Sequence, residues 1–98
     1  MQRKRLEFSV RALRDIERIE DYYAEVAGEG TAERISATVI AQAVKIADLG
    51  LLFRPGIRQG TRECVMTRYP YTVVYRSTAR SVKIVRVLHQ RAEYFNRR

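Results

Sequence analysis

The chain has 98 residues, of which 46% are hydrophobic and 31% are charged. This length and composition predict one globular domain over residues 1–98 with a modest core, and they exclude a disordered chain. No apolar run is long enough to cross a bilayer, and no signal-peptide pattern follows the basic residues 1–5, so we expect a cytoplasmic protein without membrane contact. With one cysteine, Cys64, and one histidine, His89, we expect no disulfide within the chain, no metal site and no cofactor.

The net charge is +8, from 19 basic and 11 acidic residues. Only three of the basic residues, Lys4, Lys45 and Lys83, are lysines. A basic surface favours an acidic partner, and arginine favours planar contacts with carboxylate or phosphate. A basic surface that serves only solubility is the alternative interpretation.

A short strand and a helical hairpin are predicted for the first half of the chain. Leu6 and Phe8 alternate with polar residues, and Ser9 is a suitable helix cap. A first helix follows, stopped by Gly28 and Gly30, with apolar spacings of three and four residues that predict one buried stripe at Val10, Leu13, Ile16, Ile19, Tyr23 and Val26. A second helix is expected from the cap Thr31 to Gly50, antiparallel to the first because the connection is short.

Three strands are predicted for the second half. After a loop at 51–60, the strands are expected at 62–68, 71–76 and 82–89, followed by a polar and basic tail. The order β-α-α-β-β-β indicates an α+β fold in which the helical hairpin packs on one face of a small, mainly antiparallel sheet.

Both faces of the predicted sheet are substantially apolar. We assign to the core one set of alternating residues, Tyr71, Val73, Tyr75, Val85 and Val87. The second set contains two arginines and is therefore assigned to an open face that binds a partner, namely Thr72, Val74, Arg76, Ile84, Arg86 and Leu88.

Several local patterns occur in a characteristic order. They are Asp15-Ile16 with Ile19 and Tyr23, then Arg54-Pro55-Gly56, Tyr71-Thr72-Val73-Val74-Tyr75, and finally Val85-Arg86-Val87-Leu88-His89-Gln90-Arg91. With the element order and the charge, they resemble the RelE/ParE toxin superfamily over nearly the whole chain. The resemblance implies a type II toxin–antitoxin system in which the C-terminal segment of an antitoxin wraps the toxin, giving a hetero-oligomer.

The superfamily has two functional branches. RelE-like members cut messenger RNA in the ribosomal A site, and ParE-like members poison DNA gyrase without known nuclease chemistry. RelE-like members commonly carry arginine in a strand pattern Arg-Leu-Val-Tyr, whereas Thr72 stands at that place here. This difference favours the ParE-like branch, with gyrase inhibition by protein–protein contact and no catalytic residue.

The alternatives are a RelE-like endoribonuclease acting on ribosome and mRNA, an inactive homologue that only binds antitoxin, and a simple nucleic-acid binder. For a nuclease, the candidate catalytic residues are His89, Arg86 and Arg76. For a gyrase poison, the candidate target-binding residues are Arg86, His89, Arg91 and Tyr94. In every toxin reading, the open-face set from Thr72 to Leu88 is the candidate antitoxin-binding surface.

Overall fold

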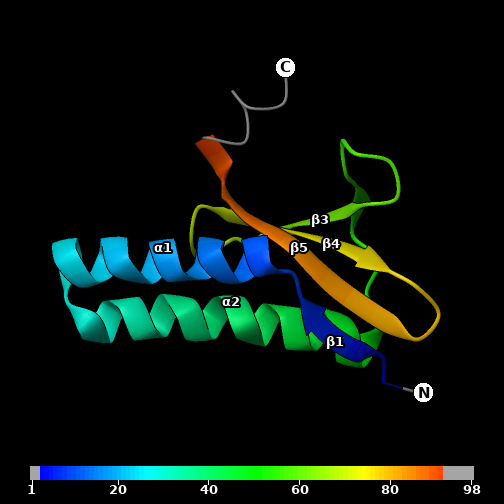
Figure 1. The fold of residues 1–98 in the computed structure, drawn as a ribbon, viewed down its shortest axis with the longest axis horizontal. Coiled ribbons are helices and arrows are strands. Elements are labelled where there is room, and N and C mark those ends of the chain that lie inside the picture. Colours follow the sequence, from blue (N-terminus) through cyan, green and yellow to red (C-terminus); the bar gives the residue numbers. More distant parts are fainter. Residues whose placement is uncertain (1–2, 92–98) are drawn as a thin grey trace.

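A computed structural model describes residues 3–91 (Figure 1). Two helices lie side by side against a five-stranded sheet, which confirms the α+β prediction. The elements, in chain order, are β1 (Arg5–Phe8), α1 (Val10–Ala27), α2 (Glu29–Leu49), β2 (Arg54–Pro55), β3 (Arg62–Val65), β4 (Tyr71–Ser77) and β5 (Ser81–His89). No helix within residues 3–91 is long and apolar enough to span a membrane.

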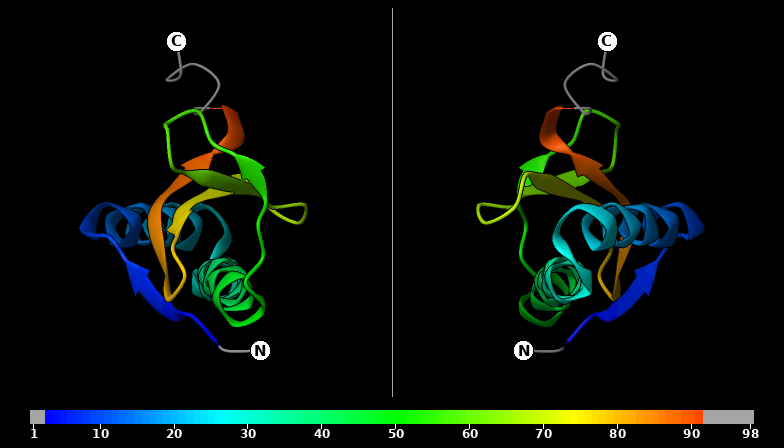
Figure 2. Two further views of the ribbon diagram at one scale, coloured as in Figure 1. Left: turned by 90° about the vertical axis from the view of Figure 1, so that its right-hand side faces the viewer. Right: turned by 90° about the vertical axis from the view of Figure 1, so that its left-hand side faces the viewer.

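The strand order in the sheet is β1-β5-β4-β3-β2. Strand β1 runs parallel to β5, and the other neighbours are antiparallel. The views along the helices show both helices on one side of the curved sheet (Figure 2). One face of the sheet is therefore covered by α1 and α2, and the other face is left open.

Helix α1 begins as predicted but buries a different stripe. The Ser9 side chain accepts a hydrogen bond of 3.0 Å from the Ala12 backbone N–H, which confirms Ser9 as the cap. The prediction that Val10, Leu13 and Val26 belong to the core is wrong, because their side chains are 64%, 53% and 59% exposed. The buried side chains of α1 are Ala12, Asp15, Ile16 and Ile19.

The helical hairpin turns at Gly28 alone. Helix α2 begins at Glu29, two residues before the predicted cap Thr31, and Gly28 makes the connection with φ of 90°. A positive φ of this kind strains any residue that carries a Cβ, so glycine is favoured there. Helix α2 ends at Gly50 as predicted, with Gly50 in the left-handed conformation.

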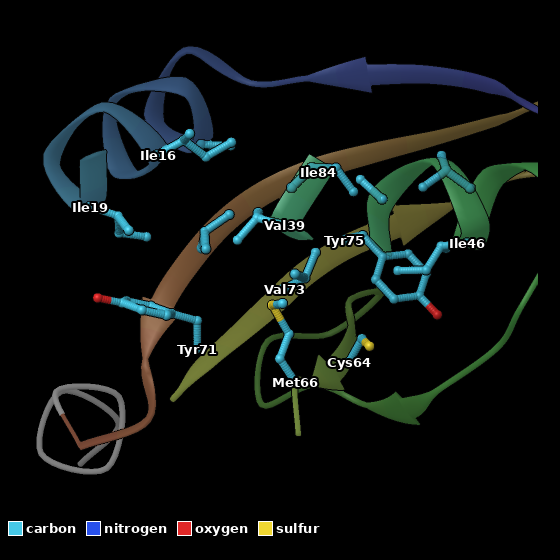
Figure 3. Close-up of a cluster of buried hydrophobic side chains, with 14 of the residues drawn as sticks. Ile16, Ile19, Val39, Ile46, Cys64, Met66, Tyr71, Val73, Tyr75 and Ile84 are labelled. Atoms are coloured by element: carbon cyan, nitrogen blue, oxygen red, sulfur yellow. The ribbon is translucent and has the colours of Figure 1, made fainter. Parts of the chain in front are cut away.

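The core lies between the helices and the covered face of the sheet (Figure 3). Tyr71, Val73 and Tyr75 of β4 are all buried and point toward the helices, which confirms their assignment to the core. The Tyr75 hydroxyl donates to the Leu51 carbonyl at 2.8 Å and accepts from the Phe53 N–H at 2.9 Å. Burial raises the pKa of this phenol. Tyr75 therefore ties the segment that leaves α2 to the sheet.

An irregularity between β4 and β5 changes which side chains face the core. Val74 pairs with Arg86, but the next residue, Tyr75, pairs with Ile84. The extra residue, Val85, is a β-bulge, and it reverses the alternation of side chains on that strand. The predicted face assignments of Ile84 and Val85 are therefore wrong: Ile84 is completely buried in the core, and Val85 is partly exposed on the open face.

The strands also differ from the prediction around the loop at 51–60. Strand β3 ends at Val65 rather than at residue 68, and the loop contains the two-residue strand β2. Arg54 and Pro55 of β2 pair with Glu63 and Arg62. This short strand holds the loop beside the open face of the sheet.

Candidate partner-binding groove

The open face of the sheet is hollowed into a groove of about 620 Å³. Side chains of β4 and β5 form its floor, the loop between β2 and β3 forms one wall, and the start of α1 contributes a second. The lining residues are Ser9, Arg11, Ile57, Arg58, Thr61, Glu63, Val74, Arg76, Lys83, Val85, Arg86 and Leu88.

Five cations and one acidic side chain line this groove, and we call it the basic groove. Glu63 is only 3% exposed, and its carboxylate pairs with the Arg54 guanidinium at 3.1 Å. Aliphatic side chains of Ile57, Val74, Val85 and Leu88 lie among the charges. A surface of this kind suits an anionic partner that also carries apolar side chains.

Asp15 and Arg86 form a clasp between α1 and β5. The Asp15 Oδ2 atom accepts from Arg86 Nε at 2.8 Å, and Oδ1 accepts from Arg86 Nη2 at 3.1 Å. Oδ2 also accepts the backbone N–H of Val87 at 2.9 Å. The hydrogen bond to Asp15 raises the pKa of Arg86. A bidentate pair with a third bond to the backbone holds both side chains in one orientation.

The position of Asp15 follows from the shortness of β1. The last pair between β1 and β5 is Phe8 with Ile84. Beyond it, the Ser9 side chain donates to the Val85 carbonyl at 2.9 Å, and Asp15 accepts from Val87. Ser9 and Asp15 thus supply hydrogen-bond partners for backbone groups of β5 that lie beyond the end of β1. Buried backbone N–H and C=O groups need such partners.

Arg76 fastens the loop wall of the basic groove to its floor. Its Nη1 atom donates to the Gln59 carbonyl at 3.1 Å. The neighbouring Gly60 has φ of 81°, and a Cβ there would lie 2.7 Å from Arg76 Nη1. A side chain at residue 60 would therefore both strain the backbone and displace the arginine.

Three of the predicted antitoxin-binding residues are less accessible than expected. Ile84 lies in the core because of the bulge, and Thr72 is completely buried with no hydrogen-bond partner for its hydroxyl among the described residues. Val74 is 8% exposed and lies at the floor of the basic groove. Arg76, Arg86 and Leu88 lie on the open face as predicted, where they line the groove.

His89 lies on the other face of the sheet. It pairs with the core residue Tyr71, and the two rings meet edge to face with centroids 5.3 Å apart. His89 Nδ1 accepts the backbone N–H of Arg91 at 3.1 Å. The three candidate nuclease residues are therefore divided, with Arg76 and Arg86 on the open face and His89 on the covered one.

Two further predicted residues lie at or beyond the end of the described chain. Arg91 is exposed just after β5. Tyr94, predicted to contact the target, lies outside the described residues 3–91.

Sequence reasoning missed several residues of the groove and the clasp. The prediction that Asp15 lies on the exposed surface of the first helix, with the other charged residues, is wrong, because Asp15 is buried. A single acidic residue within an otherwise apolar helix face is a signal for a buried partner. Glu63 is buried, and nothing in its local sequence indicates this. Arg11 precedes the adjacent residues Ile57 and Arg58 by more than 40 positions, so only the fold brings it beside them.

The comparisons with known proteins agree with this fold. Residues 6–94 match the family model described as the ParE toxin of the type II toxin-antitoxin system parDE. The candidate toxin Y4kP of Sinorhizobium fredii is 33% identical over 94 residues, covering 96% of each chain. A solved structure of the chromosomal ParDE system from P. aeruginosa superimposes with a TM-score of 0.81 at 20% identity, covering 88% of this chain and 95% of the other. This chain therefore belongs to the ParE toxin family of type II toxin–antitoxin systems.

Proposed function

We propose that this toxin inhibits DNA gyrase by protein–protein contact and that its cognate antitoxin neutralises it. Membership of the ParE toxin family supports this target over the ribosome. The observation that carries the proposal is the division of the candidate nuclease residues between the two faces of the sheet. A phosphate bound on the open face would lie across the sheet from the His89 ring, which argues against an acid–base pair at one scissile bond.

The two arginines on the open face are also held by the protein itself. Arg86 is paired with Asp15, and Arg76 donates to the Gln59 carbonyl. Stabilising a transition state calls for donors aimed at the developing charge together with a proton acceptor nearby. Because both arginines already donate to acceptors of the protein itself, their arrangement favours binding over cleavage.

The target assignment is tested with purified toxin in two parallel assays. In the first, gyrase supercoils relaxed plasmid, and we expect the toxin to inhibit it. In the second, ribosomes translate a defined messenger, and we expect no A-site cleavage. The His89→Ala variant should keep most of the gyrase inhibition, because it removes only one of the proposed contacts with gyrase. Cleavage of messenger by the parent, abolished in a folded His89→Ala variant, would contradict the proposal.

The antitoxin is proposed to occupy the basic groove. Charge complementarity supports this placement, because the acidic residues of a partner segment would meet Arg58, Arg76 and Lys83 while its apolar residues meet Val85 and Leu88. Arg91 and Tyr94, with His89, remain the proposed contacts for gyrase. Hydrogen exchange tests the antitoxin placement, since new protection should appear across β4, β5 and the loop at 56–61, and unchanged protection there would exclude it.

A further inference from the structure

Asp15 of α1 holds the guanidinium of Arg86 at the edge of the basic groove. We propose that Asp15 is a positioning residue that fixes Arg86 as a receptor for a carboxylate side chain of the antitoxin segment. This inference rests on the proposed occupancy of the basic groove. Beyond that proposal, it identifies Asp15 as the residue that orients Arg86, and a carboxylate as the group that Arg86 binds.

The clasp leaves part of the Arg86 guanidinium available. A guanidinium has five N–H donors in a rigid plane. Nε and one N–H of Nη2 are directed at Asp15. The other three donors remain for a second acceptor, and the side chain is 28% exposed and lines the basic groove. The plane of these donors is set before any partner arrives, so binding need not immobilise a long side chain.

In the basic groove, the residues that attract an anionic partner differ from the residue that orients its carboxylate. Asp15 and Arg86 together are neutral, so the clasp itself attracts an anion only weakly. The attraction comes from Arg11, Lys83 and the loop residue Arg58, all of which are exposed. Arg86 contributes the direction in which the carboxylate must approach, because its free donors have one fixed orientation.

The surroundings of Arg86 define the rest of the ligand. Arg86 is opposite Val74 in the sheet, follows Val85 in the chain and lies two residues before Leu88. These aliphatic side chains exclude water from the partner's carboxylate and strengthen its hydrogen bonds. The chemistry thus fits a glutamate or aspartate flanked by aliphatic residues. No aromatic side chain lines the groove within the described residues, so it offers no stacking surface for the bases of a nucleic acid.

Calorimetric titration with the cognate antitoxin tests the inference. Asp15→Asn removes the charge and one strong acceptor while keeping the size of the side chain, and we expect the dissociation constant to rise about tenfold. Glu17→Gln is the matched control, because it makes the same change at an exposed position of the same helix, and it should change affinity by less than about twofold. Equal affinities of the two folded variants would overturn the proposal.

A second variant guards against loss of the fold in Asp15→Asn. Arg86→Lys keeps a cation beside Asp15 but lacks the planar set of donors, and we expect it to weaken antitoxin binding to a similar degree. The double variant should bind no more weakly than Arg86→Lys alone, because both changes remove one receptor. If the double variant instead lost affinity by the product of the two single factors, Asp15 would not act through Arg86.

An NMR measurement separates this inference from the proposed function. The Nε–H signal of Arg86 is followed while poly-L-glutamate is added, with Arg34 of α2 as the reference. We expect the Arg86 signal to shift in the parent and to shift much less in Asp15→Asn. If the antitoxin itself fails to protect the groove, the partner assignment is wrong, and this titration still decides whether Asp15 makes Arg86 a carboxylate receptor. Equal shifts in parent and variant would refute the role of Asp15.

Discussion

The two faces of the sheet are built by alternate residues of the same strands, yet they meet different surroundings. On the covered face, Val73, Tyr75 and Ile84 are completely buried against the helices. On the open face, Arg76 and Lys83 are exposed beside a groove. An alternating sequence pattern therefore indicates that a strand has two faces. When the strand contains a bulge, the pattern alone does not assign each residue to the covered or the open face.

The largest expected effect tests the bulge that divides the two faces. Ile84→Ala should lower the free energy of unfolding by about 2–5 kcal/mol, because it opens a cavity in a packed core. Val85→Ala, one residue along, should cost less than about 1 kcal/mol because its side chain is partly exposed. Urea denaturation of both variants measures this contrast. A larger loss at Val85 would mean that the bulge lies elsewhere.

A second change removes the anchor between the covered face and the loop. Tyr75→Phe keeps the ring but leaves the Leu51 carbonyl and the Phe53 N–H without their partner. We expect the free energy of unfolding to fall by about 2 kcal/mol, since two part-buried backbone groups lose a hydrogen bond. Tyr69→Phe is a control at a half-buried tyrosine on the β3–β4 connection and should have a smaller effect. Equal losses would argue against the anchoring role of Tyr75.

A third change acts on the open face alone. Lys83→Glu reverses an exposed charge in the basic groove and should weaken antitoxin binding about tenfold, or about 1.4 kcal/mol, with little change in stability. Lys45→Glu, exposed on α2 and outside the groove, is the matched control. Titration in low and high salt should show the difference between the two shrinking as salt is added. Similar weakening by both variants would indicate attraction by net charge alone.

The smallest expected effect concerns Thr72, which belongs to the open-face alternation but is buried. Thr72→Val replaces its hydroxyl, which has no hydrogen-bond partner among the described residues, by a methyl group of similar size. We expect the free energy of unfolding to rise by about 1 kcal/mol, because burying an unpaired hydroxyl is costly. Thermal unfolding measures this gain. A loss of stability would reveal that the hydroxyl has a partner in the folded protein.

The regular parts of the fold could be predicted because local chemistry determines them. The Ser9 cap, the stop at Gly50 and the three-strand meander all follow from short patterns, and the structure confirms them. The prediction for the buried face of α1 was partly wrong because two of its four buried residues are Ala12 and Asp15, and neither is a large apolar residue.

The groove could be predicted only in outline. An apolar strand pair that also carried arginines indicated a binding face, and Arg76, Arg86 and Leu88 were correctly placed there. The bulge that buries Ile84 depends on the pairing of two strands, so no local pattern reports it. Likewise, Asp15 and Arg86 are 71 residues apart in the chain, and only the packing of α1 on β5 makes them a pair.

The parallel pairing of β1 with β5 has a consequence for the order in which the protein can assemble during translation. Arg5 lies opposite Ser81 and Phe8 opposite Ile84, so the first strand has no partner until the last one has been synthesised. The helical hairpin, whose contacts are closer in sequence, can form earlier. Until β5 arrives, the covered face, the bulge and the groove do not exist. A chain cut before Ser81 therefore lacks the strand that pairs with both β1 and β4, and it cannot form the basic groove.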